Sequence, residues 1–218
     1  MNKSPIRIIT VFTLVLMMVA SSVIVAEAAG ISKPPYIGYK WIDNPTVMYG
    51  ATATGHFRNG TINAIDNVNS VLKNAGSSIK LKKSTTNRTA GKVQPGEIAI
   101  QSYNYSETGW VGLTSYKLKR PQVTWVIESN TIKINNFYWQ SGNRRCMATD
   151  NGWPNHNATR GTQSVVAHEL CHALGFDHPK ATLVNQSSIL YPTVETYVRN
   201  GVYLVDVATQ SAIKNYYK

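Results

Sequence analysis

Hydrophobic residues recur at helical spacing in two segments of the chain. The first segment carries apolar residues every three or four positions, at Ile62, Ile65, Val68, Val71 and Leu72. This spacing predicts an amphipathic helix that begins at Asn59 or Thr61 and ends at Gly76. The second segment follows a polar stretch and has its apolar residues at Val165, Val166, Leu170, Ala173 and Leu174. It predicts a second helix, capped by Thr162 and ended by Gly175.

Between the two helices, from Ile79 to Trp139, apolar and polar residues alternate, as is typical of strands. The runs are IKLKK, EIAIQSY, WVGLTSY, VTWVI and TIKINNFYW, separated by Gly, Asn, Ser and Pro clusters. A first strand is expected within YKWIDNPTVMYG, Tyr39–Gly50. Asp206 is expected to cap a last helix, whose apolar residues are Val207, Ile213, Tyr216 and Tyr217. The order of these elements indicates an α+β fold.

The N-terminal residues have the pattern of an export signal. Lys3 and Arg7 precede an uncharged run over residues 8–26, and Ala26-Glu27-Ala28 is a small-x-small cleavage pattern. We therefore expect a signal peptide over residues 1–28, a short segment over 29–37 and one domain over 38–218. The run is also long enough for an uncleaved membrane anchor. Both interpretations export the domain.

The composition supports one domain with a sizeable core and a basic surface. The chain has 218 residues, 43% of them hydrophobic, and a formal net charge of +11. Such a charge keeps a protein soluble, or attracts it to anionic cell-surface polymers. Nucleic acid is not an expected partner, because the Lys and Arg residues are scattered and the export signal removes the chain from the cytoplasm. We expect a monomer.

The segment HELCHALGFDH, His168–His178, has the spacing of a metal site. Residues four apart share one face of a helix, so His168 and His172 can direct imidazole nitrogens at one point. Gly175 can adopt positive φ, end the helix and turn the chain so that His178 becomes the third ligand. Three such ligands are typical of catalytic zinc, which keeps a fourth position for water. Glu169 lies beside this face and can accept a proton from the water as general base.

This segment matches HExxHxxGxxH and so resembles the zinc signature of the metzincin metallopeptidases. SSILYP at Ser187–Pro192, TIKINNFYW and VDVATQSAIKNYY resemble the turn, a strand and the closing helix of the matrixin branch. The resemblance implies a two-lobed catalytic domain. It would have a twisted, mostly parallel five-stranded sheet, two long helices and a small irregular C-terminal lobe ending in a helix. It also implies a peptide substrate bound in extended form along an edge strand, for which Trp110–Tyr116 is the candidate.

The chain departs from the matrixin pattern in several places. Leu190 occupies the position of the methionine in the turn beneath the zinc, a roughly volume-conserving replacement that we expect activity to survive. Tyr191 and Pro192 are expected to form a wall of the specificity pocket, and neither is expected to bind the metal. The segment before the first strand is too short for a pro-segment with an inhibitory cysteine. Residues 98–145 contain no histidine and only two acids, so calcium is not predicted.

The two cysteines of the chain, Cys146 and Cys171, raise a separate question. A disulfide between them is favoured in an oxidising extracellular setting and would stabilise the fold by roughly 3 kcal/mol. The alternatives are an inert buried thiol and a Cys171 thiolate on the zinc, which would block the open ligand position.

The leading hypothesis is a secreted zinc endopeptidase with one catalytic zinc ion, extracellular or associated with the cell surface. One alternative is a surface-binding module of the same fold with little catalysis. An intact Glu169 argues against it, because such a module has no physical need for a general base. Another alternative is an amidase that uses the same zinc chemistry on cell-wall peptides.

Overall fold

The core of the fold is a sheet whose central strand is buried on both faces. The computed structural model describes residues 30–50, 55–89, 92–120, 125–140, 147, 153 and 155–218. The expected signal peptide lies outside these residues and stays a prediction. Residues Ser32–Lys218 form one compact unit. Among the described residues, no helix is long and apolar enough to cross a membrane.

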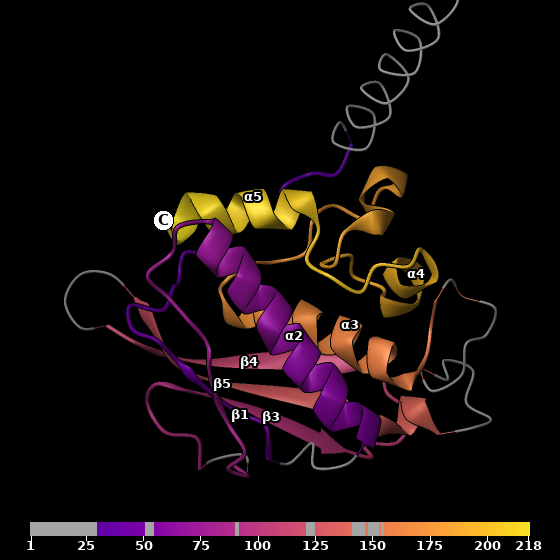
Figure 1. The fold of residues 1–218 in the computed structure, drawn as a ribbon, viewed down its shortest axis with the longest axis horizontal. Helices are drawn as coiled ribbons and strands as arrows, with labels where there is room; N and C mark the ends of the chain where they lie inside the picture. Colours follow the sequence, from indigo (N-terminus) through magenta and orange to yellow (C-terminus); the bar gives the residue numbers. More distant parts are fainter. Residues whose placement is uncertain are drawn as a thin grey trace, which may run out of the picture. The chain divides into compact units, whose positions relative to one another are not determined.

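Five strands form this sheet, in the order β2-β1-β3-β5-β4 (Figure 1). They are β1 (Thr46–Met48), β2 (Lys82–Ser84), β3 (Glu97–Tyr103), β4 (Gly112–Lys119) and β5 (Val126–Asn135). All neighbouring pairs are parallel except β4 with β5, which is antiparallel. The α+β class and a mostly parallel five-stranded sheet are therefore confirmed. The antiparallel strand β4 is an edge, because it pairs with β5 alone.

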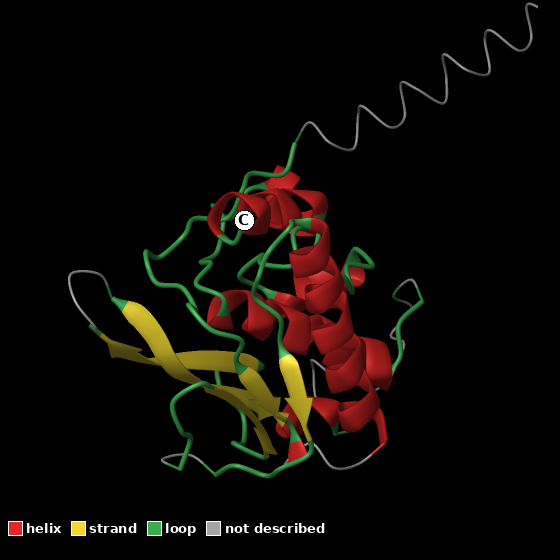
Figure 2. Cartoon of the chain, turned by 60° about the vertical axis from the view of Figure 1, so that its left-hand side comes forward, coloured by secondary structure: helices red, strands yellow, loops and turns green. Residues whose placement is uncertain are grey.

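The long helices α2 (Gly55–Asn74) and α3 (Ala158–Ala173) lie on one side of the sheet (Figure 2). The apolar stripe of α2 is buried, and Gly76 ends the helix with a φ of 74°. The remaining helices are η2 (Asn136–Trp139), η3 (Leu183–Ser187), α4 (Val194–Arg199) and α5 (Val207–Tyr216). The side chain of Asp206 caps α5 by accepting a hydrogen bond from the Thr209 N–H at 3.0 Å, which confirms the predicted cap.

Several predicted boundaries are wrong. Neither Asn59 nor Thr61 caps the first long helix, because the helix already includes Gly55. Thr162 does not begin α3. The side chain of Asn157 accepts a hydrogen bond from the Arg160 N–H and caps the helix, five residues before Thr162.

The predicted strands VTWVI and TIKINNFYW merge into a single strand, β5, and the NFYW end of the second run forms η2. Ser129 and Asn130 interrupt the apolar pattern of the sequence. In the structure they continue the strand, because Asn130 pairs with Ile98 on one side and Tyr116 on the other. The position of β5 between β3 and β4 overrides the low strand propensity of these residues. The first strand covers only Thr46–Met48 of the expected Tyr39–Gly50.

A glycine of α2 lets the helices α2 and α3 approach closely. A Cβ built on Gly60 would lie 2.6 Å from the Thr159 carbonyl oxygen and 2.8 Å from the Gln163 nitrogen. Both atoms belong to the backbone of α3, so neither can move without shifting that helix. Since α3 carries His168 and His172, this close approach fixes the helix of the two histidines against α2.

We expect Gly60→Ala to lower the free energy of unfolding by about 1–3 kcal/mol, in spite of the higher helix propensity of alanine. The reason is the overlap of the new methyl group with the backbone of α3. Urea unfolding of Gly60→Ala beside Asn63→Ala, an exposed position of the same helix, measures the effect. Equal stability of the two variants would contradict the close approach.

A partly buried ion pair between Arg88 and Glu97 fastens a loop to the sheet at β3. The Arg88 guanidinium donates to the Glu97 carboxylate at 2.8 Å, and the Gln94 N–H donates to the same carboxylate at 2.9 Å. Burial raises the pKa of the Glu97 carboxyl, but the hydrogen bonds from Arg88 and Gln94 outweigh it, so that this pKa lies below its ordinary value.

A lowered pKa in the folded state contributes stability that is present above the pKa of the unfolded chain and is lost as the pH falls through the folded value. We therefore expect the wild type to lose stability below about pH 4.3, the ordinary pKa of glutamate, more steeply than Glu97→Gln. Urea midpoints between pH 7 and pH 3 measure this difference, with Glu107→Gln as an exposed control. Parallel pH curves for the wild type and Glu97→Gln would refute it.

Candidate metal centre

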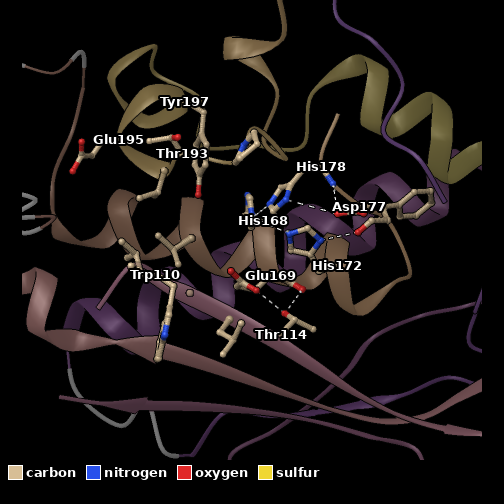
Figure 3. Close-up of a pocket in the computed structure, with 18 of the residues that line it drawn as sticks. Trp110, Thr114, His168, Glu169, His172, Asp177, His178, Thr193, Glu195 and Tyr197 are labelled. Carbon is tan, nitrogen blue, oxygen red and sulfur yellow. Dashed lines mark hydrogen bonds and ion pairs between the residues drawn. The ribbon is translucent and has the colours of Figure 1, made fainter. Parts of the chain in front are cut away.

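The helix α3 and the turn that follows it bring three histidines together. His168 and His172 are four residues apart on α3 and share one face (Figure 3). After the C-cap Leu174, Gly175 has a φ of 93°, and the N–H groups of Gly175 and Phe176 donate to the carbonyls of His172 and Cys171. This is the hydrogen-bond pattern of a Schellman motif. The turn reverses the chain and places His178 beside the two histidines of α3.

The position of Gly175 is also sterically closed to other residues. A Cβ built on it would overlap the carbonyl oxygen of Tyr39. The N-terminal segment passes close by, because the Ile37 N–H donates to the Gly175 carbonyl at 2.9 Å and the Asp177 N–H donates to the Pro35 carbonyl at 2.8 Å. This contact could not be predicted, since these N-terminal residues lie in a short polar and aromatic stretch without a recognisable pattern.

The Nε2 atoms of the three histidines converge on one point. They lie 2.9 Å apart for His168 and His172, 3.1 Å for His172 and His178, and 3.2 Å for His168 and His178. Two nitrogens bound tetrahedrally to one zinc ion, each at about 2.0–2.1 Å, are about 3.3 Å apart. The spacing of the three Nε2 atoms therefore fits a shared metal ion, and the three histidines are positioned to bind one.

Backbone carbonyls fix the orientation of two of these rings. Nδ1 of His168 lies 2.7 Å from the Ile189 carbonyl, and Nδ1 of His172 lies 2.7 Å from the Phe176 carbonyl. A carbonyl can only accept, so each Nδ1 carries the proton and each Nε2 presents a lone pair. The rings are also held neutral. Burial lowers the pKa of His168 well below its ordinary value and that of His172 to about 4, and the neighbouring histidines act in the same direction.

A carboxylate fixes the turn beneath His168. One oxygen of Asp206 accepts hydrogen bonds from the Ile189 N–H at 2.9 Å and from the Ser188 hydroxyl at 3.1 Å. Leu190, in the same turn, is fully buried. Asp206, the N-cap of α5, thus positions Ile189, whose carbonyl orients His168. The sequence indicated only its role as a helix cap.

Glu169 lies beside the histidines and is nearly completely buried. One carboxylate oxygen, Oε2, accepts a hydrogen bond from the Thr114 hydroxyl of β4 at 2.6 Å. Burial raises the pKa of Glu169 to about 7, although the hydrogen bond from Thr114 lowers it. A carboxyl with a pKa near neutrality can both take up and release a proton at physiological pH.

The histidines and Glu169 lie in a cleft of about 530 Å³. One wall is formed by the edge strand and the residues before it, Gly109 to Tyr116, and the other by residues from Pro192 to Tyr197 (Figure 3). Tyr197, on α4, is buried, and its ring stacks on that of His168 with 5.4 Å between the centroids. Pro192 lines the cleft, whereas Tyr191 packs against the hydrophobic core and is not among the lining residues.

Cys171 lies on α3 and is completely buried, and no described residue forms a disulfide with it. Burial raises the pKa of this thiol above its ordinary value, and the charges of Asp206 and Glu169 raise it further. Its sulfur is not among the ligand atoms that converge with the three histidines. Cys146 lies outside the described residues, so the disulfide between the two cysteines stays a prediction.

Comparisons with known proteins give no family for this chain. Neither the models of protein families nor the curated proteins contain a match. Among solved structures, the chain is similar to one described as the GM1-bound form of the ECX AB5 holotoxin. The two are 13% identical, the alignment covers 84% of this chain and 81% of that chain, and the TM-score is 0.39. So distant a likeness carries no argument about function.

Because ligands that bind only the folded state stabilise it, we expect zinc chloride to raise the Tm of the metal-stripped protein. His178→Ala should remove most of this rise, since only two of the three nitrogens remain. Differential scanning calorimetry with and without zinc gives the measurement, and His56→Ala, a histidine outside the cluster, is the control. A Tm that does not respond to zinc would contradict the metal centre.

Proposed function

We propose that the protein is a secreted zinc endopeptidase that hydrolyses peptide bonds with the help of an activated water molecule. The observation that carries this proposal is the convergence of three Nε2 atoms within 3.2 Å, next to a buried glutamate, inside an open cleft. Three nitrogen ligands and one adjacent carboxylate are the requirements of metal-assisted hydrolysis.

Zinc is the metal that this donor set suits best among the common cations. Three neutral imidazoles favour zinc over magnesium and calcium, which prefer oxygen ligands. His168, His172 and His178 would hold the ion. When bound, zinc supplies Lewis acidity, which polarises a carbonyl group and makes water more acidic.

Glu169 is the group of the chain that moves protons in this proposal. Its carboxylate accepts a proton as water attacks the peptide carbonyl and returns it to the nitrogen of the leaving amine. A pKa of about 7 suits both tasks. The same burial argues against a module that only binds surfaces, because a buried carboxylate costs stability and binding to a surface does not require it.

The open edge of β4 supports a peptide substrate in extended form. The strand pairs with β5 on one side, and several of its residues line the cleft on the other. An extended peptide can therefore add to the sheet through main-chain hydrogen bonds, with its scissile bond over the histidines. The opposite wall of the cleft includes Pro192, Val194 and Tyr197. We propose that these residues select the side chains of the substrate, a role that the sequence indicated for Tyr191 and Pro192.

The matrixin-like, two-lobed metzincin fold belongs to the same proposal. It is supported by the HExxHxxGxxH spacing, by the antiparallel edge strand beside the metal helix and by the closing helix α5. We further propose that the domain acts outside the cell, on the basis of the N-terminal pattern, and that its basic charge attracts it to anionic polymers of the cell surface.

We expect the zinc-loaded protein to cleave casein or gelatin, a chelator to abolish the cleavage, and Glu169→Ala to lower its rate by at least about a hundredfold. The reason is the loss of the proton acceptor while the three ligands remain. Release of labelled fragments measures the rate, and the zinc content of the variant shows that the metal is still bound. Undiminished cleavage by zinc-loaded Glu169→Ala would exclude this mechanism.

A further inference from the structure

Every second residue of β4 from Gly112 to Tyr116 faces α3, the helix that carries His168, Glu169 and His172. Each of these three residues of β4 contacts that helix. The hydroxyl of Tyr116 donates to the His172 carbonyl at 2.6 Å, Thr114 donates to Glu169, and the backbone of Gly112 lies directly against the Glu169 side chain. Alternate side chains of a strand point to the same face, so these contacts have one register. The strand that forms one wall of the cleft is thereby fastened to the helix that carries the general base.

The hydroxyl of Thr114 makes the shortest of these contacts to Glu169. It lies 2.6 Å from Oε2 and 3.1 Å from the main-chain oxygen of the same residue. A hydroxyl has one proton to donate, and a charged acceptor at the shorter distance is the stronger partner. The bond therefore goes to the carboxylate and fixes the rotation of the carboxylate plane.

Gly112 provides the space for the other half of the carboxylate. A Cβ built on this glycine would overlap Oε1 of Glu169 and would lie 2.8 Å from its Cγ and 2.9 Å from its Cδ. The backbone of Gly112 has no positive φ that would require glycine. The missing side chain is thus explained by the position of Glu169 and by no demand of the strand itself.

The two oxygens of Glu169 are consequently not equivalent. Oε2 is held by Thr114, whereas Oε1 accepts no hydrogen bond from any residue that the structure describes. We propose that Thr114 and Gly112 are positioning residues for the general base: Thr114 fixes Oε2, and Gly112 leaves the space from which Oε1 is presented to water in the cleft. This inference rests on the proposed endopeptidase function, which gives Glu169 its task.

The benefit of this arrangement is orientation. A buried carboxylate without a fixed partner samples several rotamers, and a displacement of about 1 Å at a catalytic group can cost about a hundredfold in rate. The Thr114 hydroxyl removes this freedom by holding Oε2 of Glu169. Threonine is suited to the position because its branched side chain has few rotamers in a strand.

The test compares Thr114→Val, which keeps the shape and removes the hydroxyl, with Thr114→Ser, which keeps the hydroxyl. With zinc-loaded protein and labelled casein, we expect Thr114→Val to lower kcat about 10- to 100-fold with KM within about twofold, and Thr114→Ser to restore most of the activity. Gly112→Ala should lower kcat as well. Thr131→Val, the same substitution on the opposite face of the sheet, is the control and should behave as wild type. Bound zinc should be unchanged in all variants.

A second measurement does not depend on catalysis. If Thr114 holds the Glu169 carboxylate, Thr114→Val lowers the Tm of the wild type more than it lowers the Tm of Glu169→Ala, where there is no carboxylate to hold. Equal losses of Tm in the two backgrounds would overturn the inference. So would a kcat for Thr114→Val within about twofold of wild type, or a Thr114→Ser variant as slow as Thr114→Val.

The same experiments separate this inference from the function on which it rests. Absence of casein cleavage by the zinc-loaded wild type, or full activity of Glu169→Ala, would refute the proposed function. In that case the comparison of Tm values alone decides whether Thr114 positions the carboxylate.

Discussion

The convergence of three imidazole Nε2 atoms on one point is the constraint on which the rest of this structure depends. Neutral imidazole nitrogens about 3 Å apart repel one another, and each ring must be prevented from turning away. The chain achieves this by occupying the Nδ1–H groups of His168 and His172 with backbone carbonyls. These hydrogen bonds hold the Nε2 atoms close together although the atoms repel one another, and a bound cation would remove this repulsion.

The carbonyls that orient the rings come from separate regions of the chain, and each is itself held in place. Phe176 belongs to the turn after α3, which also pairs with residues 35–37 near the N-terminus. Ile189 belongs to the turn that Asp206 anchors from α5. Glu169, the proposed general base, has a third support, from Thr114 of β4. The histidine cluster is local in sequence, but its geometry depends on contacts with residues far away along the chain.

The features that depend on local spacing could be predicted from the sequence. The α2 stripe, the stop at Gly76 and the cap at Asp206 follow from short-range patterns of hydrophobicity and turn residues. The mostly parallel sheet was expected only from the resemblance to a known family. His168 and His172 are four residues apart, and that they share one face likewise follows from helix geometry alone. In contrast, the continuity of β5 through Ser129 and Asn130 depends on pairing with two neighbouring strands, and no window of the sequence contains that information.

The supports of the site were unpredictable for the same reason. In the sequence, nothing distinguishes Thr114 and Gly112 from other strand residues. Their role depends on contact with Glu169, which lies 55 positions beyond Thr114. Tyr197 has no distinctive pattern around it in the sequence, and its stacking on His168 depends on how α4 packs. Such residues could be found from sequence only if changes at the two partners were seen to occur together.

The hydrogen bonds of Asp206 have a consequence for how the protein is made. The chain is synthesised from its N-terminus, so the three histidines emerge well before the residue that anchors the turn beneath them. Until Asp206 has emerged, its carboxylate cannot accept the hydrogen bond of the Ile189 N–H that fixes the turn beneath His168. Completion of the site therefore waits for the synthesis of Asp206, although the whole histidine motif precedes it in the chain.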